Sequence, residues 1–192
     1  MRQLNGYANA SVMTDTEKLP AGGYVLKIMG VKYENGEAGK NDTLIISFDI
    51  TEGDFKDFYA KQYRANTNDD KKWKGNYRLR VPFDDGSTQD AKTQNIFKTA
   101  ISCIEESNNG YHWDWDETKL KGKTVGGLFR EKEYDYNGRH GFFTECMCFK
   151  SASLIREGKF TVPEPRLLPA APTTSEGFMS VPVGNDDLLP FS

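Results

Sequence analysis

The sequence predicts an all-β fold, a β-barrel that includes one helix, followed by a disordered C-terminal tail. Three observations lead to this prediction. Residues 43–51 alternate strictly between apolar and polar side chains, which is the period of a β-strand. Two β-rich segments flank the Asn137-Gly138 dipeptide, a strong hairpin signal. Six of the eight prolines lie at or after Pro163, where a packed domain gives way to a linker.

The first two strands follow a turn over residues 19–23. Residues 24–33 are rich in β-branched and aromatic side chains and predict a strand. Gly30 in its middle indicates a bulge or a sharp bend, as barrels require. Residues 43–51 form the second strand, and its predicted core face is Leu44, Ile46, Phe48 and Ile50.

The next segment is less regular. Residues 54–65 hold several aromatic side chains and are compatible with either a continuing strand or a short helix. The polar residues 66–75 predict a loop, and residues 77–83 predict a short strand. Pro82 restricts that strand to an edge or an end of the sheet.

A helix is predicted after Ser87 or Thr88, either of which can cap it, with Asp90 in its first turn. Its apolar positions, Phe97, Ala100, Ile101 and Ile104, repeat at helical spacing, and Asn108-Asn109-Gly110 ends it. Residues 124–136 and 141–149 predict the two strands of the hairpin, and residues 154–160 a last short strand.

The predicted order is three strands, a helix and two strands. This order matches the OB-fold, a five-stranded Greek-key barrel, with a generic α+β sheet domain as the alternative. We expect a flexible N-terminal arm over residues 1–18, the barrel over 19–160, a Pro-rich disordered linker over 161–185 and an acidic tip over 186–192.

The three cysteines, Cys103, Cys146 and Cys148, are too few for a disulfide framework and are expected to be small packed side chains. Cys146 and Cys148 are two residues apart and are predicted to share a strand face. No apolar run approaches the roughly 18 residues that span a bilayer, and the N-terminus lacks a secretory signal. We therefore expect a cytoplasmic protein without metal or cofactor.

The charge distribution is uneven. Of 25 basic and 28 acidic residues, the last 32 positions hold one arginine and four carboxylates, so residues 1–160 carry 24 of each sign. Residues 61–80 nevertheless hold seven cations against two carboxylates, a net charge of +5, with aromatic side chains between them. Cations that follow phosphates and rings that stack on bases are typical of single-stranded nucleic-acid binding. The candidate residues are Lys61, Tyr63, Arg64, Lys71, Lys72, Trp73, Lys74, Tyr77, Arg78 and Arg80. The alternative is a solvated loop whose aromatic side chains are anchored in the core.

The hairpin supports the same interpretation. In a regular strand, Leu128 shares one face with Arg130, Lys132, Tyr134 and Tyr136, beside a turn that carries Arg139. The alternative is a surface strand whose charges serve solubility.

Residues 111–117 place Trp113 and Trp115 among acidic side chains that repel phosphate, so these rings are interpreted as packing or as a partner surface. Enzyme motifs are absent from the sequence: it has no phosphate-binding glycine loop and no paired metal-ligand spacing. Asp84, Asp85, Asp114 and Asp116 are possible Mg²⁺ ligands, but acidic pairs in turns usually face water. We do not expect an enzyme.

The C-terminal residues are the most specific feature. Asp186, Asp187, Leu188, Leu189, Pro190 and Phe191 resemble the acidic tip of bacterial single-stranded DNA-binding proteins, which docks onto replication, recombination and repair enzymes. The resemblance implies that Phe191 fills an apolar pocket and that the two aspartates meet cations. The chain differs from that tip in having Ser192 after the phenylalanine, a second leucine and only two acids.

The body resembles a second group, small single-stranded DNA-binding proteins encoded by phages and integrated elements of Gram-positive bacteria. The resemblance rests on residues 19–25, 44–53 and 121–126 and implies an OB-fold with a role in phage replication or recombination.

The sequence thus favours a protein that binds single-stranded DNA without strong sequence preference and recruits partner enzymes through its tip. A homo-oligomer is compatible with this hypothesis, because a dimer would lengthen the path for DNA. The neutral body favours a rival, a protein-interaction adaptor or inhibitor without direct DNA binding. RNA binding is a third hypothesis, since OB-folds serve both polymers.

Overall fold

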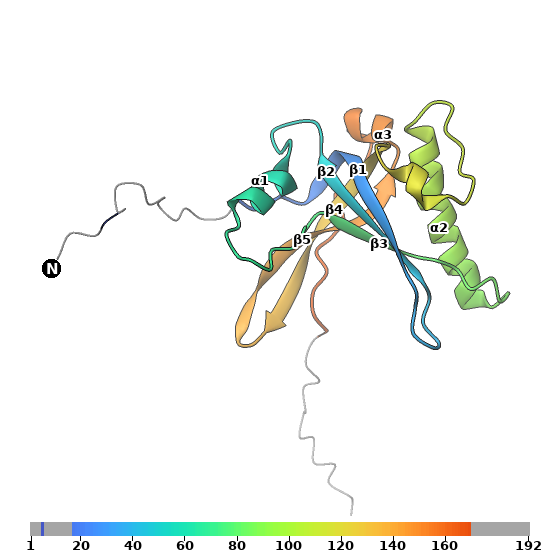
Figure 1. Ribbon diagram of the computed structural model, residues 1–192, viewed down its shortest axis with the longest axis horizontal. Helices are drawn as coiled ribbons and strands as arrows, with labels where there is room; N and C mark the ends of the chain where they lie inside the picture. Colours follow the sequence, from blue (N-terminus) through green and yellow to red (C-terminus); the bar gives the residue numbers. More distant parts are fainter. Residues whose placement is uncertain (1–4, 6–16, 170–192) are drawn as a thin grey trace, which may run out of the picture.

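The structure is a computed structural model that describes residue 5 and residues 17–169, so most of the predicted N-terminal arm and the whole acidic tip lie outside the described residues. Figure 1 shows a twisted sheet with helices at its two ends. In chain order the elements are β1 (Gly22–Glu34), β2 (Thr43–Ile50), α1 (Phe58–Ala65), β3 (Asn76–Arg80), α2 (Thr88–Glu106), a 3₁₀-helix (Glu117–Leu120), β4 (Thr124–Tyr136), β5 (Arg139–Lys150) and α3 (Ala152–Arg156).

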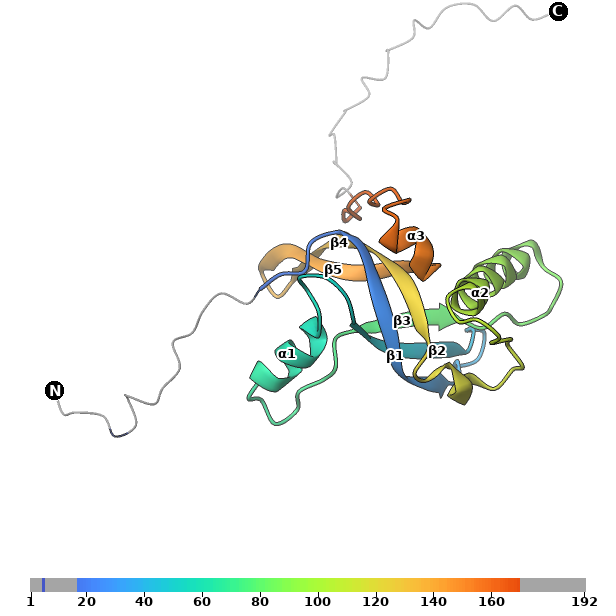
Figure 2. The same cartoon turned by 90° about the horizontal axis from the view of Figure 1, so that it is seen from above.

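The strands form one antiparallel sheet in the order β3-β2-β1-β4-β5. The predicted bulge is confirmed, because the β1–β2 register shifts between Ile28 and Gly30. The sheet curves strongly (Figure 2), and its two edge strands approach each other. The rings of Tyr77 on β3 and Phe149 on β5 have centroids 4.5 Å apart. The result is an open sheet with a barrel-like shape.

The alternation predicted for the second strand is confirmed. Leu44, Ile46, Phe48 and Ile50 are at most 2% exposed and belong to the main core. Helix α2 closes one end of that core with the apolar positions predicted for it. Ser87 caps α2 by accepting a hydrogen bond from the Asp90 backbone N–H, as predicted.

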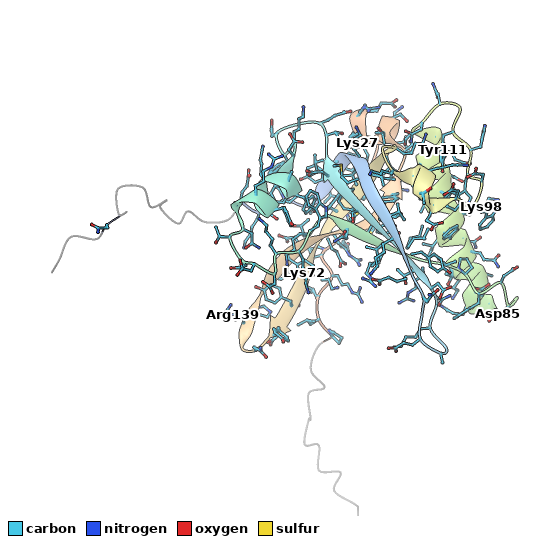
Figure 3. The ribbon with its side chains drawn as sticks, viewed as in Figure 1. Lys27, Lys72, Asp85, Lys98, Tyr111 and Arg139 are labelled. Atoms are coloured by element: carbon cyan, nitrogen blue, oxygen red, sulfur yellow. The ribbon has the colours of Figure 1, made fainter. Side chains whose placement is uncertain are left out.

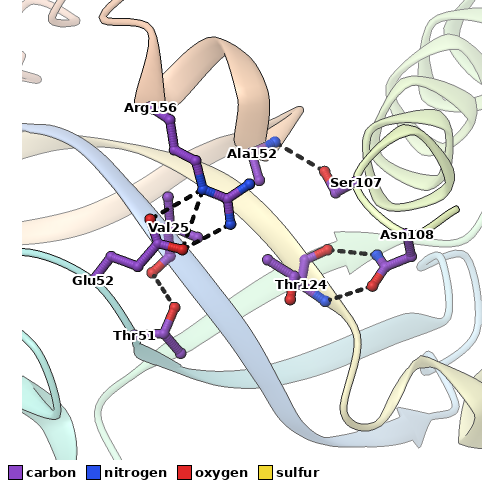
Figure 4. Close-up of polar contacts among 8 residues, drawn as sticks. All are labelled: Val25, Thr51, Glu52, Ser107, Asn108, Thr124, Ala152 and Arg156. Atoms are coloured by element: carbon purple, nitrogen blue, oxygen red, sulfur yellow. Dashed lines mark hydrogen bonds and ion pairs between the residues drawn. The ribbon is translucent and has the colours of Figure 1, made fainter.

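Polar side chains fasten the elements to one another (Figure 4). The Asn108 side chain, just after α2, donates to the backbone carbonyl of Thr124 (2.7 Å) and accepts from its N–H (3.0 Å), which fixes the end of α2 to the start of β4. Arg156 of α3 forms a fork with the Glu52 carboxylate, with a shortest N–O distance of 2.7 Å.

The prediction of a single helix is wrong, because α1 and α3 are also present. Helix α1 resolves the strand-or-helix alternative left open for residues 54–65. Its first turn is held by Asp49 of β2, whose buried carboxylate accepts from the backbone N–H groups of Tyr59 and Ala60, both at 3.0 Å. This long-range cap satisfies donors that the helix itself leaves without partners.

Helix α3 replaces the strand predicted for residues 154–160, which is also wrong. Ala152 and Ile155, one helical turn apart, pack on Val25 and Leu128 as a small second core cluster. Burial of that face outweighs the weak strand preference of the segment.

The predicted common face for Cys146 and Cys148 is wrong as well. The β4–β5 register passes from Leu128–Cys148 to Phe129–Cys146, so β5 contains one extra residue. That bulge turns Cys146 toward the main core and Cys148 toward the second cluster. Burial raises the pKa of the Cys146 thiol well above its usual range. All three cysteines are free thiols, with Cys103 buried and the other two half-buried.

The pairing of β1 with β4 ends at the pair Gly22–Phe129. Strand β4 continues beyond Phe129, so this part of its edge is not covered by β1. Residues 166–168, the C-terminal strap, cover part of this edge. The Arg166 N–H donates to the Glu131 carbonyl (2.8 Å), and its own carbonyl accepts from the Glu133 N–H (2.9 Å). None of the helices in the described ranges is long and apolar enough to cross a membrane.

Candidate nucleic-acid interface

A groove of about 1090 Å³ separates α1 and β3 from the β4–β5 hairpin. It occupies the region where the two edge strands of the open sheet do not pair. Five cations and three carboxylates line it, so its charge is positive. Its charged lining residues are Lys18, Lys74, Arg78, Arg130, Lys132, Glu17, Glu131 and Glu145, and its aromatic ones are Phe58, Tyr59, Tyr77, Tyr134, Phe142 and Phe143.

The strongest unneutralised positive charge lies on α1 and the loop after it. Within residues 17–169, none of the five cations of this segment lies in an ion pair, and nearly all are exposed; they are Lys61, Arg64, Lys71, Lys72 and Lys74. Helix α1 is attached to β2 through Asp49, so the two cations on this helix, Lys61 and Arg64, are presented from a fixed base. Lys71 contacts the Asn66 carbonyl and the Tyr63 ring, whereas the other four cations are available to phosphate groups without first breaking such a contact.

Two of the predicted stacking rings serve the fold instead. Tyr77 is 8% exposed and packs on Phe149, and burial raises the pKa of its phenol. The Trp73 indole N–H donates to the backbone carbonyls of Phe48 and Gly75, both at 3.1 Å. Strand alternation could have identified Tyr77, because it shares its face with the apolar Leu79.

Tyr63 remains 37% exposed, with the Lys71 ammonium 4.8 Å from its ring centroid. It lies on another face of α1 from the groove. There, with Arg64 and Trp73, it lines a separate hollow of about 520 Å³. The basic segment thus borders two hollows rather than one continuous site.

The hairpin places Arg130, Lys132 and Tyr134 on one face, as predicted. Glu145 of β5 pairs with both Arg130 (2.9 Å) and Lys132 (3.2 Å), so a single carboxylate partly neutralises two cations. The Phe143 ring lies 6.1 Å from the Tyr134 ring and 5.5 Å from the Lys132 ammonium. This face therefore combines one net positive charge with two exposed rings.

Most of the remaining predicted residues lie outside the groove lining, and Arg78 is the exception. Tyr136 is 72% exposed near the hairpin turn, and Figure 3 labels Arg139 at the end of the hairpin and Lys72 in the loop after α1. Arg80 lies at the far end of β3, opposite Thr43. Arg78 borders the groove and pairs with Glu34 at 2.9 Å.

Phe142 and Phe143 are exposed groove residues that the sequence reasoning missed. The Asn137-Gly138 turn could have identified them from the sequence. Asn137 and Gly138 both have positive φ, 51° and 71°, as a two-residue hairpin turn requires. That turn sets the register, which places Phe143 opposite Lys132 and Phe142 opposite Glu133.

Within residue 5 and residues 17–169, no group of three or more histidine, cysteine or carboxylate side chains is arranged to hold a metal ion. The carboxylates that are possible Mg²⁺ ligands by sequence have other contacts. Asp114 pairs with Lys119, Asp116 accepts from Thr118, and Asp85 accepts from the Ser87 backbone N–H. No protein-family model matches the chain, and no curated protein matches it significantly.

Proposed function

We propose that the chain is an OB-fold protein that binds single-stranded DNA without strong sequence preference and recruits other proteins through its C-terminal tip. Two features support the fold assignment: the strand order, and the position of α2 between β3 and β4. One observation carries the binding proposal. Lys74, which lies in no ion pair among the described residues, lines a positively charged groove whose opposite wall presents exposed rings, and four further cations without ion pairs lie on α1 and the loop that precedes Lys74.

Binding to labelled oligo-dT, followed by fluorescence anisotropy across a salt series, tests this proposal. If about four phosphates are neutralised, log affinity falls against log salt with a slope near −2.8. Affinity should then fall roughly fifty-fold between about 50 and 200 mM salt. Absence of binding at low salt, or a slope near zero, would refute DNA binding. Oligo-U and duplex DNA in the same assay separate DNA from RNA and single from double strands.

The unpaired lysines provide a sharper test. Lys72→Ala combined with Lys74→Ala removes two exposed charges that have no internal partner. We expect weaker binding and a salt slope that is shallower by about 1.4. The matched control combines Lys92→Ala with Lys98→Ala on α2, which lines no part of the groove. Equal losses in both double variants would mean that the charge acts through the whole molecule rather than at the groove.

The rings are tested by Phe143→Ala, which removes a 44% exposed side chain from the groove wall. Base stacking contributes roughly 1–3 kcal/mol per base, so affinity should fall about 5- to 150-fold. Phe83→Ala, at a 52% exposed position outside the groove lining, serves as the control and should bind normally.

The tip proposal rests on the sequence of residues 186–191. We expect Phe191→Ala to abolish capture of replication or recombination enzymes by the full chain. Phe178→Ala, in the preceding linker, is the control and should retain capture. Undiminished capture by Phe191→Ala would contradict the role assigned to the ring.

A protein-interaction adaptor is the second candidate function. One observation favours it. Arg130 and Lys132 of the hairpin both form ion pairs with Glu145, so part of their charge is neutralised within the protein and is not available to phosphate groups. In that case the groove binds a polypeptide. Any residual affinity for oligo-dT should then be the same in the native chain, the lysine double variant and Phe143→Ala.

A further inference from the structure

Trp115 is an exposed ring on a strained backbone. Its side chain is 76% exposed, and its φ is +66°, in the left-handed region that bulky residues rarely adopt. Such a conformation has an energetic cost that the surrounding structure must offset. A large apolar side chain that faces water on such a backbone suggests that Trp115 contacts another molecule.

The loop that carries Trp115 is held on both sides. The Trp113 backbone N–H donates to the Glu105 carboxylate at 2.8 Å, and Asp114 forms an ion pair with Lys119. Asp116 accepts from the Thr118 backbone N–H at 3.1 Å and so caps the following 3₁₀-helix. The ring is therefore presented by a fixed loop.

The three rings of this region have different roles. Phe97 is buried, and Trp113 packs partly against the main core, with its centroid 6.3 Å from that of Phe97. Trp115 lies nearly parallel to Phe97, with 10° between the ring planes and 6.4 Å between centroids. Trp113 thus belongs to the packing, whereas most of the Trp115 surface faces solvent.

The charge around Trp115 is negative. Residues 105–117 hold five carboxylates and neither lysine nor arginine; they are Glu105, Glu106, Asp114, Asp116 and Glu117. The nearest following lysine, Lys119, is paired with Asp114 and Asp116, and the Lys123 ammonium lies 4.3 Å from the Tyr111 ring centroid. With Lys121 counted as well, residues 105–123 carry a net charge of −2, which opposes a phosphate backbone and favours a cationic ligand.

We propose that Trp115 and the carboxylates beside it form a docking surface for an arginine-rich segment of a partner protein. A guanidinium group stacks on an indole face and bonds to carboxylates in the same plane, which an ammonium group does less well. The surface lies outside the groove lining, and its proposal does not depend on DNA binding there.

Trp115→Gly tests the proposal without the usual risk of unfolding, because glycine accepts a positive φ without strain. Its thermal midpoint should equal or exceed that of the native chain. The probe is a fluorescent peptide of alternating arginine and glycine, titrated into the full-length protein. We expect its affinity to fall about ten-fold in Trp115→Gly. It should be preserved in Trp115→Tyr and unchanged in Tyr136→Ala, a comparably exposed ring on the hairpin.

Three results would overturn the proposal. Equal peptide affinity in Trp115→Gly would show that the peptide responds only to overall charge. A clearly lower thermal midpoint would assign Trp115 to the fold. A loss of oligo-dT affinity in Trp115→Gly would assign the ring to nucleic-acid stacking instead.

Discussion

Substitution of Asp49 should destabilise the fold strongly. It is 5% exposed and accepts from the backbone N–H groups of Ile50, Tyr59 and Ala60 at 2.9–3.0 Å. Asp49→Ala leaves the buried Tyr59 N–H without an acceptor, which costs about 1–3 kcal/mol. The Ala60 N–H also loses its cap, but this residue is only partly covered and water can replace the acceptor. The lost cap therefore adds only about 1 kcal/mol. We expect a total loss of about 2–4 kcal/mol in the free energy of unfolding.

Urea denaturation, followed by circular dichroism, measures this loss. Asp49→Asn retains one acceptor oxygen and should lose less, roughly 1 kcal/mol. Asp54→Ala is the control, since this exposed aspartate lies in the turn just before α1. A loss below about 0.5 kcal/mol for Asp49→Ala, within the range of ordinary surface substitutions, would refute the assignment of Asp49 as the cap of α1.

Further predictions concern the turn, the packing, the ion pair and the tail. Gly138→Ala, at φ +71°, should destabilise the fold by about 1 kcal/mol in the same urea assay. Gly75→Ala should cost about 1–3 kcal/mol, because its Cβ lies 2.4 Å from a backbone carbonyl oxygen. Arg156 lowers the pKa of Glu52, chiefly through their hydrogen bond, so the pair stabilises the fold above the ordinary carboxyl pKa and loses this contribution as pH falls through the lowered value. Arg156→Ala should therefore raise the pKa of Glu52 in an NMR titration, and its stability deficit should vanish in acid. If the chain binds DNA as proposed, removal of residues 170–192, which carry three carboxylates and no cation, should leave oligo-dT affinity equal or higher in the anisotropy assay, because a tethered acidic segment would compete with DNA for the cations.

Local sequence signals predicted the elements that local interactions determine. The alternation in β2, the Ser87 cap of α2 and the Asn137-Gly138 turn each depend on residues close in the chain, and the structure confirms all three. The sequence did not decide between a strand and a helix for α1, because Asp49, which caps the helix, lies on another element. Helix α3 was not predicted, because its apolar face becomes evident only from its packing on Val25 and Leu128.

The site was harder to predict than the fold, because composition does not state which way a side chain points. The basic character of residues 61–74 was evident in the sequence. The anchoring of the Trp73 indole on two carbonyls was not, since Phe48 is far away in the chain. Likewise, the neutralisation of Arg130 and Lys132 by Glu145 depends on cross-strand register.

The C-terminal strap has a consequence for solubility. Exposed strand edges recruit other strands and promote aggregation. Arg166 occupies the stretch of the β4 edge that β1 leaves uncovered, so the strap keeps that edge from pairing between molecules. Removal of the predicted linker from residue 161 onward would remove this protection along with the tail. Shortened variants should therefore end at residue 169, where loss of the tail can be studied without self-association of the sheet.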